Sequence, residues 1–219
     1  MSHPALALTS TDALLVIDMQ NDFMPNTPGH SSPLPVTEGD QIIPGINALA
    51  ARFEHVILTQ DWHPRGHISF ASTHHLHPFT DTVEAPYGTQ ALWPDHCIQG
   101  SRGAELHPGL DIPHTELILR KGFRVGIDSY SAFTENDGVT TTGLAAYLQA
   151  RGLKRLFFAG LAYDFCVGFS AVAAARLGFE AIVIEDLSRA VGLPGTVDAT
   201  NSAFAAASVQ RLASSALSA

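Results

Sequence analysis

The arrangement of apolar positions along the chain predicts buried strands. Residues 13–17 form an unbroken apolar run, Ala-Leu-Leu-Val-Ile, without the alternation of a half-exposed strand. Such a run is typical of a central parallel strand that is covered on both faces. Further strands are predicted at residues 55–60, 116–120, 154–160 and 181–185.

Between these strands, apolar residues recur at helical spacing. Helices are predicted from Gly39 or Asp40 to Ala50, from Thr140, Thr141 or Thr142 to Gly152, from Asp164 to about Leu177, and from Thr196 to about Ala213. Asp164 is the expected N-cap of the third helix. Strands that alternate with helices predict an α/β fold with a doubly wound, mostly parallel sheet and helices on both faces.

One long stretch, from Trp62 to about His114, shows little periodicity and carries most of the histidines. A connection of this length is typical of a functional loop or a small subdomain. Internal repeats and low-complexity tracts are absent from the sequence, so we expect a single domain over residues 1–219 with a loop region at about 62–114.

Composition narrows the function classes. The 219 residues are 46% hydrophobic and carry a formal net charge of −9, which disfavours nucleic acid and anionic membranes as partners. The N-terminal sequence lacks a basic leader, and the apolar runs fall short of the roughly 20 residues that span a bilayer. We therefore expect a cytoplasmic protein with free thiols at Cys97 and Cys166, and the sequence leaves open a homo-oligomer.

Reactive or charged residues stand at or just after four of the predicted strands. They are Asp18, Asp61, Lys121 and Cys166. Each alone would be an ordinary loop residue, but ligand sites in doubly wound sheets form at the carboxyl ends of the strands. Their shared location therefore predicts one functional site.

Cys166 lies where a strand is expected to turn into a helix. The helix dipole there favours a thiolate, although a lone cysteine at a helix start is more often buried and structural. Asp18 could accept the thiol proton and Lys121 could hold the thiolate, which makes a plausible nucleophilic trio. The alternative for Asp18 and Lys121 is a partly buried ion pair between neighbouring strands.

A second group of residues has the character of a metal site. Asp61 and His63 lie two apart at a strand end and project to one side, and His96 would complete a face of two histidines and one carboxylate. Such a face suits Zn²⁺, Fe²⁺ or Mn²⁺. The spacing alone leaves metal binding and an ordinary loop equally open. Aromatic residues near these strand ends could line a flat pocket or simply belong to the core: Phe23, Trp93, Tyr130 and Tyr163.

Seven segments together resemble the bacterial nicotinamidases of the isochorismatase-like cysteine hydrolase family. They are VIDMQNDF (16–23), TQDWHP (59–64), HISF (67–70), GTQALWPDHCIQGSRGAELH (88–107), RKG (120–122), DSYSAF (128–133) and AGLAYDFCV (159–167). The segments follow the family order across nearly the whole chain. Asp18 and the region of Cys166 also occur in relatives that act on other substrates.

The resemblance implies a six-stranded parallel sheet and hydrolysis of nicotinamide, with pyrazinamide as a further substrate. It implies the following roles: Asp18, Lys121 and Cys166 as catalytic triad; Ala162 and Cys166 as oxyanion donors, with a cis peptide at Leu161–Ala162; Phe23, Trp93 and Tyr130 around the pyridine ring; and Asp61, His63 and His96 as ligands of one divalent metal, foremost Zn²⁺. His67 matches a ligand in some members, and Ser69 matches a residue that holds metal-bound water. Tyr163 stands where many relatives have threonine, which leaves the pocket shape open.

Three rival functions remain at this point. The chain could hydrolyse another amide or an isochorismate-like vinyl ether, although the metal triplet argues against the latter. It could be a metallohydrolase whose metal-bound water is the nucleophile, with Cys166 structural. It could also be a binding module on the same scaffold.

Overall fold

A computed structural model describes residues 6–218, so residues 1–5 and 219 of the predicted domain lie outside the described residues. Its main sheet has six parallel strands in the order β6-β3-β2-β7-β8-β9. The strands are β2 (Asp12–Ile17), β3 (His55–Asp61), β6 (Leu117–Lys121), β7 (Arg155–Leu161), β8 (Glu180–Arg189) and β9 (Gln210–Leu212). The predicted α/β fold with a parallel sheet is confirmed.

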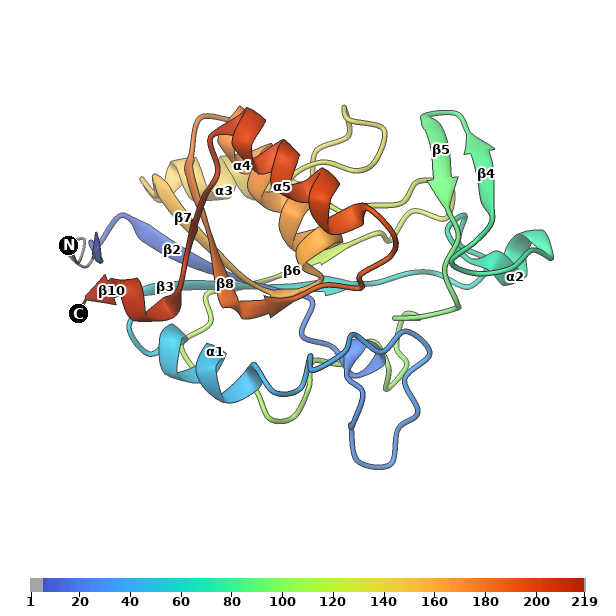
Figure 1. Cartoon of the computed structure of the whole chain (residues 1–219), viewed down its shortest axis with the longest axis horizontal. Coiled ribbons are helices and arrows are strands. Elements are labelled where there is room, and N and C mark those ends of the chain that lie inside the picture. Colours follow the sequence, from blue (N-terminus) through green and yellow to red (C-terminus); the bar gives the residue numbers. More distant parts are fainter. Residues whose placement is uncertain (1–5, 219) are drawn as a thin grey trace.

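Helices cover both faces of this sheet (Figure 1). One face carries α1 (Ile43–Ala50), and the other carries α3 (Leu144–Ala150), α4 (Gly168–Arg176) and α5 (Thr196–Ala207). Successive side chains of β2 enter two separate apolar cores: Leu14 and Val16 belong to one, and Leu15 and Ile17 to the other. Burial on both faces explains why this strand is apolar throughout.

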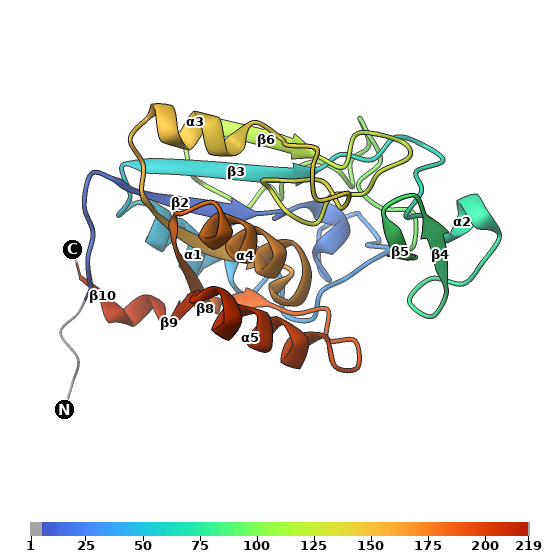
Figure 2. The same cartoon turned by 90° about the horizontal axis from the view of Figure 1, so that it is seen from above.

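Short elements extend the fold at opposite ends of the sheet. Helix α2 (Ala71–His74) and the antiparallel hairpin of β4 (Thr82–Ala85) and β5 (Gly88–Ala91) project beyond the carboxyl ends of the strands (Figure 2). At the other end, β1 (Leu6–Ala7) pairs with β10 (Leu217–Ser218), which follows the short turn η3 (Ser214–Ala216). Within the described chain, the helices are too short to cross a membrane.

All four predicted helices differ in their bounds, and α4 begins at Gly168 rather than at Asp164, after a π-helical turn over residues 163–167. Helix α1 begins at Ile43 rather than at residue 39 or 40, with Pro44 in the first turn, where its fixed φ is tolerated. Helix α3 begins at Leu144 because Gly143 adopts a left-handed φ of 90° that ends the preceding turn. The helix predicted to reach Ala213 stops at Ala207.

The residue that stops this last helix is Ser208, which adopts a left-handed conformation with φ 59°. The chain then forms β9, whose Gln210 lies beside Ile182 of β8. Periodicity did not predict this sixth strand, because the alanine-rich segment before it continues a helical pattern. The family resemblance did imply six strands.

Candidate active site and metal centre

The four residues predicted at the strand ends meet at one point. Asp61 and Lys121 are register partners at the ends of β3 and β6. The ammonium Nζ of Lys121 lies 2.8 Å from Asp18 Oδ2 and 3.2 Å from Cys166 Sγ. It also pairs with Asp61 Oδ1 and donates to the backbone oxygen of Ser129 at 3.0 Å. One ammonium group therefore joins two carboxylates and the thiol.

The ion-pair alternative supposed that Lys121 and Asp18 are only partly buried. Both side chains are fully buried. Burial lowers the pKa of Lys121, but Asp18 and Asp61 outweigh this and raise it well above its usual range. Lys121 is thus a permanent cation of the site. A cation in this position is suited to hold negative charge on the sulfur.

Asp18 is held in a strained backbone conformation, with φ 46°, by Thr59. The Thr59 hydroxyl donates to Asp18 Oδ1 at 2.6 Å, and the Asp18 backbone N–H donates to Thr59 Oγ1 at 3.0 Å. Asp18 Oδ2 faces the ammonium of Lys121 at 2.8 Å. Burial raises the pKa of Asp18, against the opposing effect of Lys121, so the carboxylate is a stronger base than usual.

A carboxylate oxygen of Asp18 lies within 4.8 Å of Cys166 Sγ. Burial raises the pKa of the Cys166 thiol well above its usual range, and Lys121 only partly opposes this. Desolvation and the two nearby carboxylates thus favour the protonated thiol. The thiol needs a base, and Asp18 is within reach.

Cys166 lies in a π-helical turn, η2 (Tyr163–Val167), which precedes α4. The peptide Leu161–Ala162 before this turn is cis, as the resemblance implied. Gly160 approaches β2 so closely that a Cβ there would lie 2.3 Å from the Ile17 oxygen. Ala162, the residue after this cis bond, lines the pocket beside Cys166.

Asp164 is not the N-cap that was predicted, because its side chain makes no capping bond to its own turn. Its carboxylate instead accepts the backbone N–H groups of Val191 and Gly192 at 2.8 and 2.9 Å and the hydroxyl of Thr196. Asp164 therefore ties the cysteine turn to the loop after β8. Val191 of that loop lines the pocket beside Cys166.

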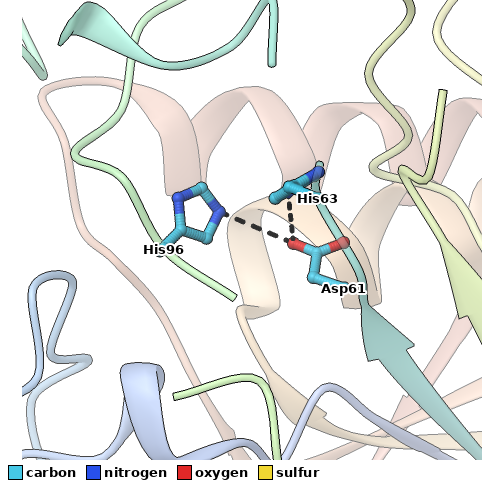
Figure 3. Close-up of side chains that lie close together, drawn as sticks. All are labelled: Asp61, His63 and His96. Atoms are coloured by element: carbon cyan, nitrogen blue, oxygen red, sulfur yellow. Dashed lines mark ion pairs between the residues drawn. The ribbon is translucent and has the colours of Figure 1, made fainter. Parts of the chain in front are cut away.

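The predicted metal ligands also lie together (Figure 3). The Nε2 atoms of His63 and His96 lie 3.4 and 3.7 Å from Asp61 Oδ2. Each Nδ1 is occupied by a backbone oxygen, that of Gly122 at 2.8 Å for His63 and that of Pro94 at 2.7 Å for His96. A donated Nδ1–H leaves the Nε2 lone pair free, which is the usual state of a metal-binding imidazole. Two such nitrogens and one carboxylate fit a divalent transition metal.

Gly122, whose oxygen orients His63, has a left-handed φ of 66°, and a Cβ there would lie 2.5 Å from His63 Cε1. His67 stacks on His63 with ring centroids 4.2 Å apart, but both of its nitrogens are occupied, one by Ser69 at 2.7 Å and one by the Ile127 oxygen at 3.3 Å. Burial lowers the pKa of His67 to about 4. His67 therefore stacks on His63 in neutral form, and with His63 and Asp128 it forms a second buried group of candidate metal ligands.

A largely apolar pocket opens onto Cys166 and onto the candidate metal ligands Asp61, His63 and His96. Phe23, Trp93 and Tyr130 line it, as predicted, and Trp93 Nε1 donates to the Tyr130 hydroxyl at 3.0 Å. The pocket walls that sequence reasoning missed are Leu34, Val36, Asp128, Phe165 and Val191. Of these, Phe165 lies next to Cys166 and Asp128 opens the DSYSAF segment, whereas Leu34, Val36 and Val191 come from loops without a distinctive pattern.

Tyr163 is not part of this pocket. Its hydroxyl donates to Asn201 Oδ1 at 2.7 Å and its ring packs edge-on against Phe204 of α5. The departure from threonine at this position therefore changes the contact with α5 and leaves the lining of the pocket unaffected.

Known proteins share this sequence and arrangement. Residues 12–215 match the Isochorismatase domain. The nicotinamidase of Acinetobacter baylyi is 49% identical over 203 residues, which cover 92% of each chain. The solved structure of an Acinetobacter baumanii nicotinamidase pyrazinamidease is 46% identical with a TM-score of 0.90, and the match covers 94% of this chain and 98% of that one.

Two further solved structures contain ligands. PnC1 from L. infantum, in complex with nicotinate, is 39% identical with a TM-score of 0.84, and 98% of both chains are covered. A pyrazinamidase of Pyrococcus horikoshii, in complex with zinc, is 30% identical with a TM-score of 0.74, and the match covers 93% of this chain and 99% of that one.

Proposed function

The chain belongs to the isochorismatase family, and we propose that it hydrolyses nicotinamide to nicotinate and ammonia, with pyrazinamide as a further substrate. The observation that carries this proposal is the placement of Cys166, with Asp18 and Lys121 behind it, in a pocket with aromatic walls beside a cluster of candidate metal ligands. Aromatic walls suit a planar pyridine carboxamide. In such a complex the carboxamide would face Cys166, and the ring nitrogen would face the candidate metal ligands.

Asp61, His63 and His96 would hold the metal, which we propose to be Zn²⁺, with Fe²⁺ and Mn²⁺ as alternatives. When bound, it would supply a Lewis-acidic position for the pyridine nitrogen. A relative in complex with zinc supports this choice. The aromatic walls formed by Phe23 and Trp93 fix the plane of the ring, so that binding energy is used to orient the carboxamide toward Cys166.

In the first half of the proposed reaction, Asp18 accepts the thiol proton and Cys166 Sγ forms a bond to the carboxamide carbon. The backbone N–H groups of Ala162 and Cys166 donate to the oxyanion, and one such donor typically contributes a factor on the order of 10² to 10³ in rate. Asp18 then returns the proton to the departing nitrogen. The C–N bond breaks, ammonia leaves, and a thioester to Cys166 remains.

In the second half, Asp18 takes a proton from a water molecule, which attacks the thioester carbon. The C–S bond breaks, Asp18 returns its proton to the sulfur, and nicotinic acid leaves and releases its carboxyl proton to solvent to give nicotinate. Lys121 keeps its proton throughout, because its neighbours raise its pKa far above neutrality. It stabilises whichever of Asp18 and Cys166 carries the negative charge.

The proposal predicts metal-dependent release of ammonia from nicotinamide. Removal of metal with a chelator is expected to abolish most of the activity, and Zn²⁺ is expected to restore it. His96→Ala should behave like the chelated protein, because the metal loses one of its three protein ligands. The matched control is His77→Ala, since the His77 side chain is 86% exposed and pairs with Asp81 on the surface. Full activity in demonstrably metal-free protein would contradict the role of the metal.

A further inference from the structure

Two buried polar side chains lie close to Asp18 in the sequence and take no part in the proposed reaction. Gln20 and Asp22 follow Asp18 in the segment that leads into the turn η1 (Asn21–Phe23), and they are 0% and 5% exposed. Buried polar groups are costly unless they are paired, so the partners of these two side chains show what the segment does.

Gln20 binds both backbone groups of the metal-ligand residue Asp61. Its amide Nε2 donates to the Asp61 oxygen at 2.8 Å, and its Oε1 accepts the Asp61 N–H at 2.8 Å. Nε2 also donates to the Ala104 oxygen at 2.9 Å. The side chain thus acts as an additional strand partner for Asp61, at the point where β3 ends.

Asp22 holds the segment that carries His96. Its Oδ2 accepts the backbone N–H of Cys97 at 2.7 Å, and Cys97 has a left-handed φ of 46° directly after His96. Its Oδ1 lies 2.7 Å from His30 Nε2. The carboxylate is closely enclosed, because a Cβ at Gly103 would lie 2.1 Å from Asp22 Oδ2. The hydrogen bond from Cys97 fixes an unusual backbone conformation at a metal ligand.

We propose that Gln20 and Asp22 are positioning residues that hold the metal ligands Asp61 and His96 in place relative to Asp18. The inference rests on the proposed metal site. Asp18, Gln20 and Asp22 all belong to one short segment after β2. The segment that carries the general base therefore also holds the two metal ligands, Asp61 and His96, through the side chains at 20 and 22. Groups that orient metal ligands typically contribute 10- to 100-fold in metal affinity.

The test measures the zinc affinity of metal-free protein by competition with a chromogenic chelator. Asp22→Ala is expected to weaken zinc binding by about 10- to 100-fold, because the Cys97 N–H loses its acceptor. Asp22→Asn should restore the affinity, since its amide oxygen can accept that N–H while its NH₂ group faces His30. His30→Ala is the matched control: it removes the other partner of Asp22 and leaves the bond to Cys97.

These variants separate positioning from a general loss of structure. A purely structural Asp22 would lower the thermal stability of Asp22→Ala and His30→Ala without a selective loss of zinc affinity. Unchanged zinc affinity in Asp22→Ala, equal losses in Asp22→Ala and His30→Ala, or failure of Asp22→Asn to restore binding would each overturn the proposal. If Asp22→Ala does not fold, Gln20→Met, which keeps the length of the side chain, carries the same expectation through Asp61.

The proposed function can fail independently of this inference. Wild-type protein that binds no zinc would contradict the proposed metal site itself. Wild-type protein that binds zinc tightly, together with unchanged binding in Asp22→Ala and Gln20→Met, would contradict only the positioning role.

Discussion

Replacement of Cys166 by alanine is expected to lower the rate of nicotinamide hydrolysis by at least about 10⁴-fold, as expected when a covalent nucleophile is removed. Cys166 Sγ lies in the pocket, 3.2 Å from Lys121 Nζ and within 4.8 Å of an Asp18 carboxylate oxygen. Alanine leaves the walls of the pocket in place, so binding of nicotinate should persist. The measurements are ammonia release and quenching of Trp93 fluorescence by nicotinate.

The matched control for this variant is Cys97→Ala. Cys97 is the second buried cysteine, but its side chain does not line the pocket. This variant should retain most of the activity. Comparable rates for wild type and Cys166→Ala would contradict the nucleophile and favour attack by a metal-bound water.

Replacement of Lys121 by methionine is expected to destabilise the metal-free fold by about 3–5 kcal/mol, because it leaves buried carboxylates without their cation. Lys121 is the common partner of Asp18 and Asp61. Activity should fall sharply as well, since negative charge on sulfur loses its counter-ion. Urea unfolding monitored by circular dichroism measures the stability, and ammonia release measures the activity.

At Asp61, the pH dependence of this loss has a definite sign. Burial raises the pKa of Asp61, but Lys121 and His63 outweigh it, so the pKa lies well below its ordinary value of 3.8. In the wild type, the stabilisation from Asp61 is therefore present above about pH 3.8 and is lost as the pH falls through the depressed value, whereas the raised pKa of Asp18 acts with the opposite sign. In Lys121→Met, the buried carboxyl groups of Asp18 and Asp61 favour protonation. The difference in the free energy of unfolding between this variant and the wild type should therefore become smaller as the pH falls.

A control for Lys121→Met is Arg151→Met. Arg151 is 43% exposed and pairs with Glu116 at 2.9 Å, so its loss should cost less than about 1 kcal/mol. Equal stability losses in the two variants would contradict the claim that burial gives Lys121 its importance.

The positions of the reactive residues were predictable because each one closes an apolar run. Strand ends in a parallel sheet meet at one edge, so the sequence alone predicts that Asp18, Asp61 and Lys121 lie together. The position of His96 could not be derived in this way, since it follows a long irregular loop whose course no periodicity reveals. Its role as a ligand was implied by the family resemblance.

The structure differs from the sequence-based predictions where tertiary contacts override the local pattern. Asp164 has the position of a helix cap, but its carboxylate instead accepts hydrogen bonds from Val191 and Gly192 of the loop after β8 and from Thr196 at the start of α5. Ser208 ends α5 by a left-handed conformation that serine seldom adopts. The contacts of Gln20 with Asp61 and of Asp22 with Cys97 join a side chain to backbone groups more than 40 residues away, and a sequence pattern carries no signal for such contacts.

The central claim is that Cys166 carries the acyl group during turnover. The most direct measurement is acid quenching of the zinc-loaded protein during steady-state hydrolysis of nicotinamide, followed by mass spectrometry of its peptides. We predict a nicotinoyl group on the peptide that contains Cys166, labile to hydroxylamine as a thioester is, and absent from Cys166→Ser and from protein quenched before substrate is added. Rapid turnover without any acylated peptide, at quench times shorter than one catalytic cycle, would contradict the covalent route.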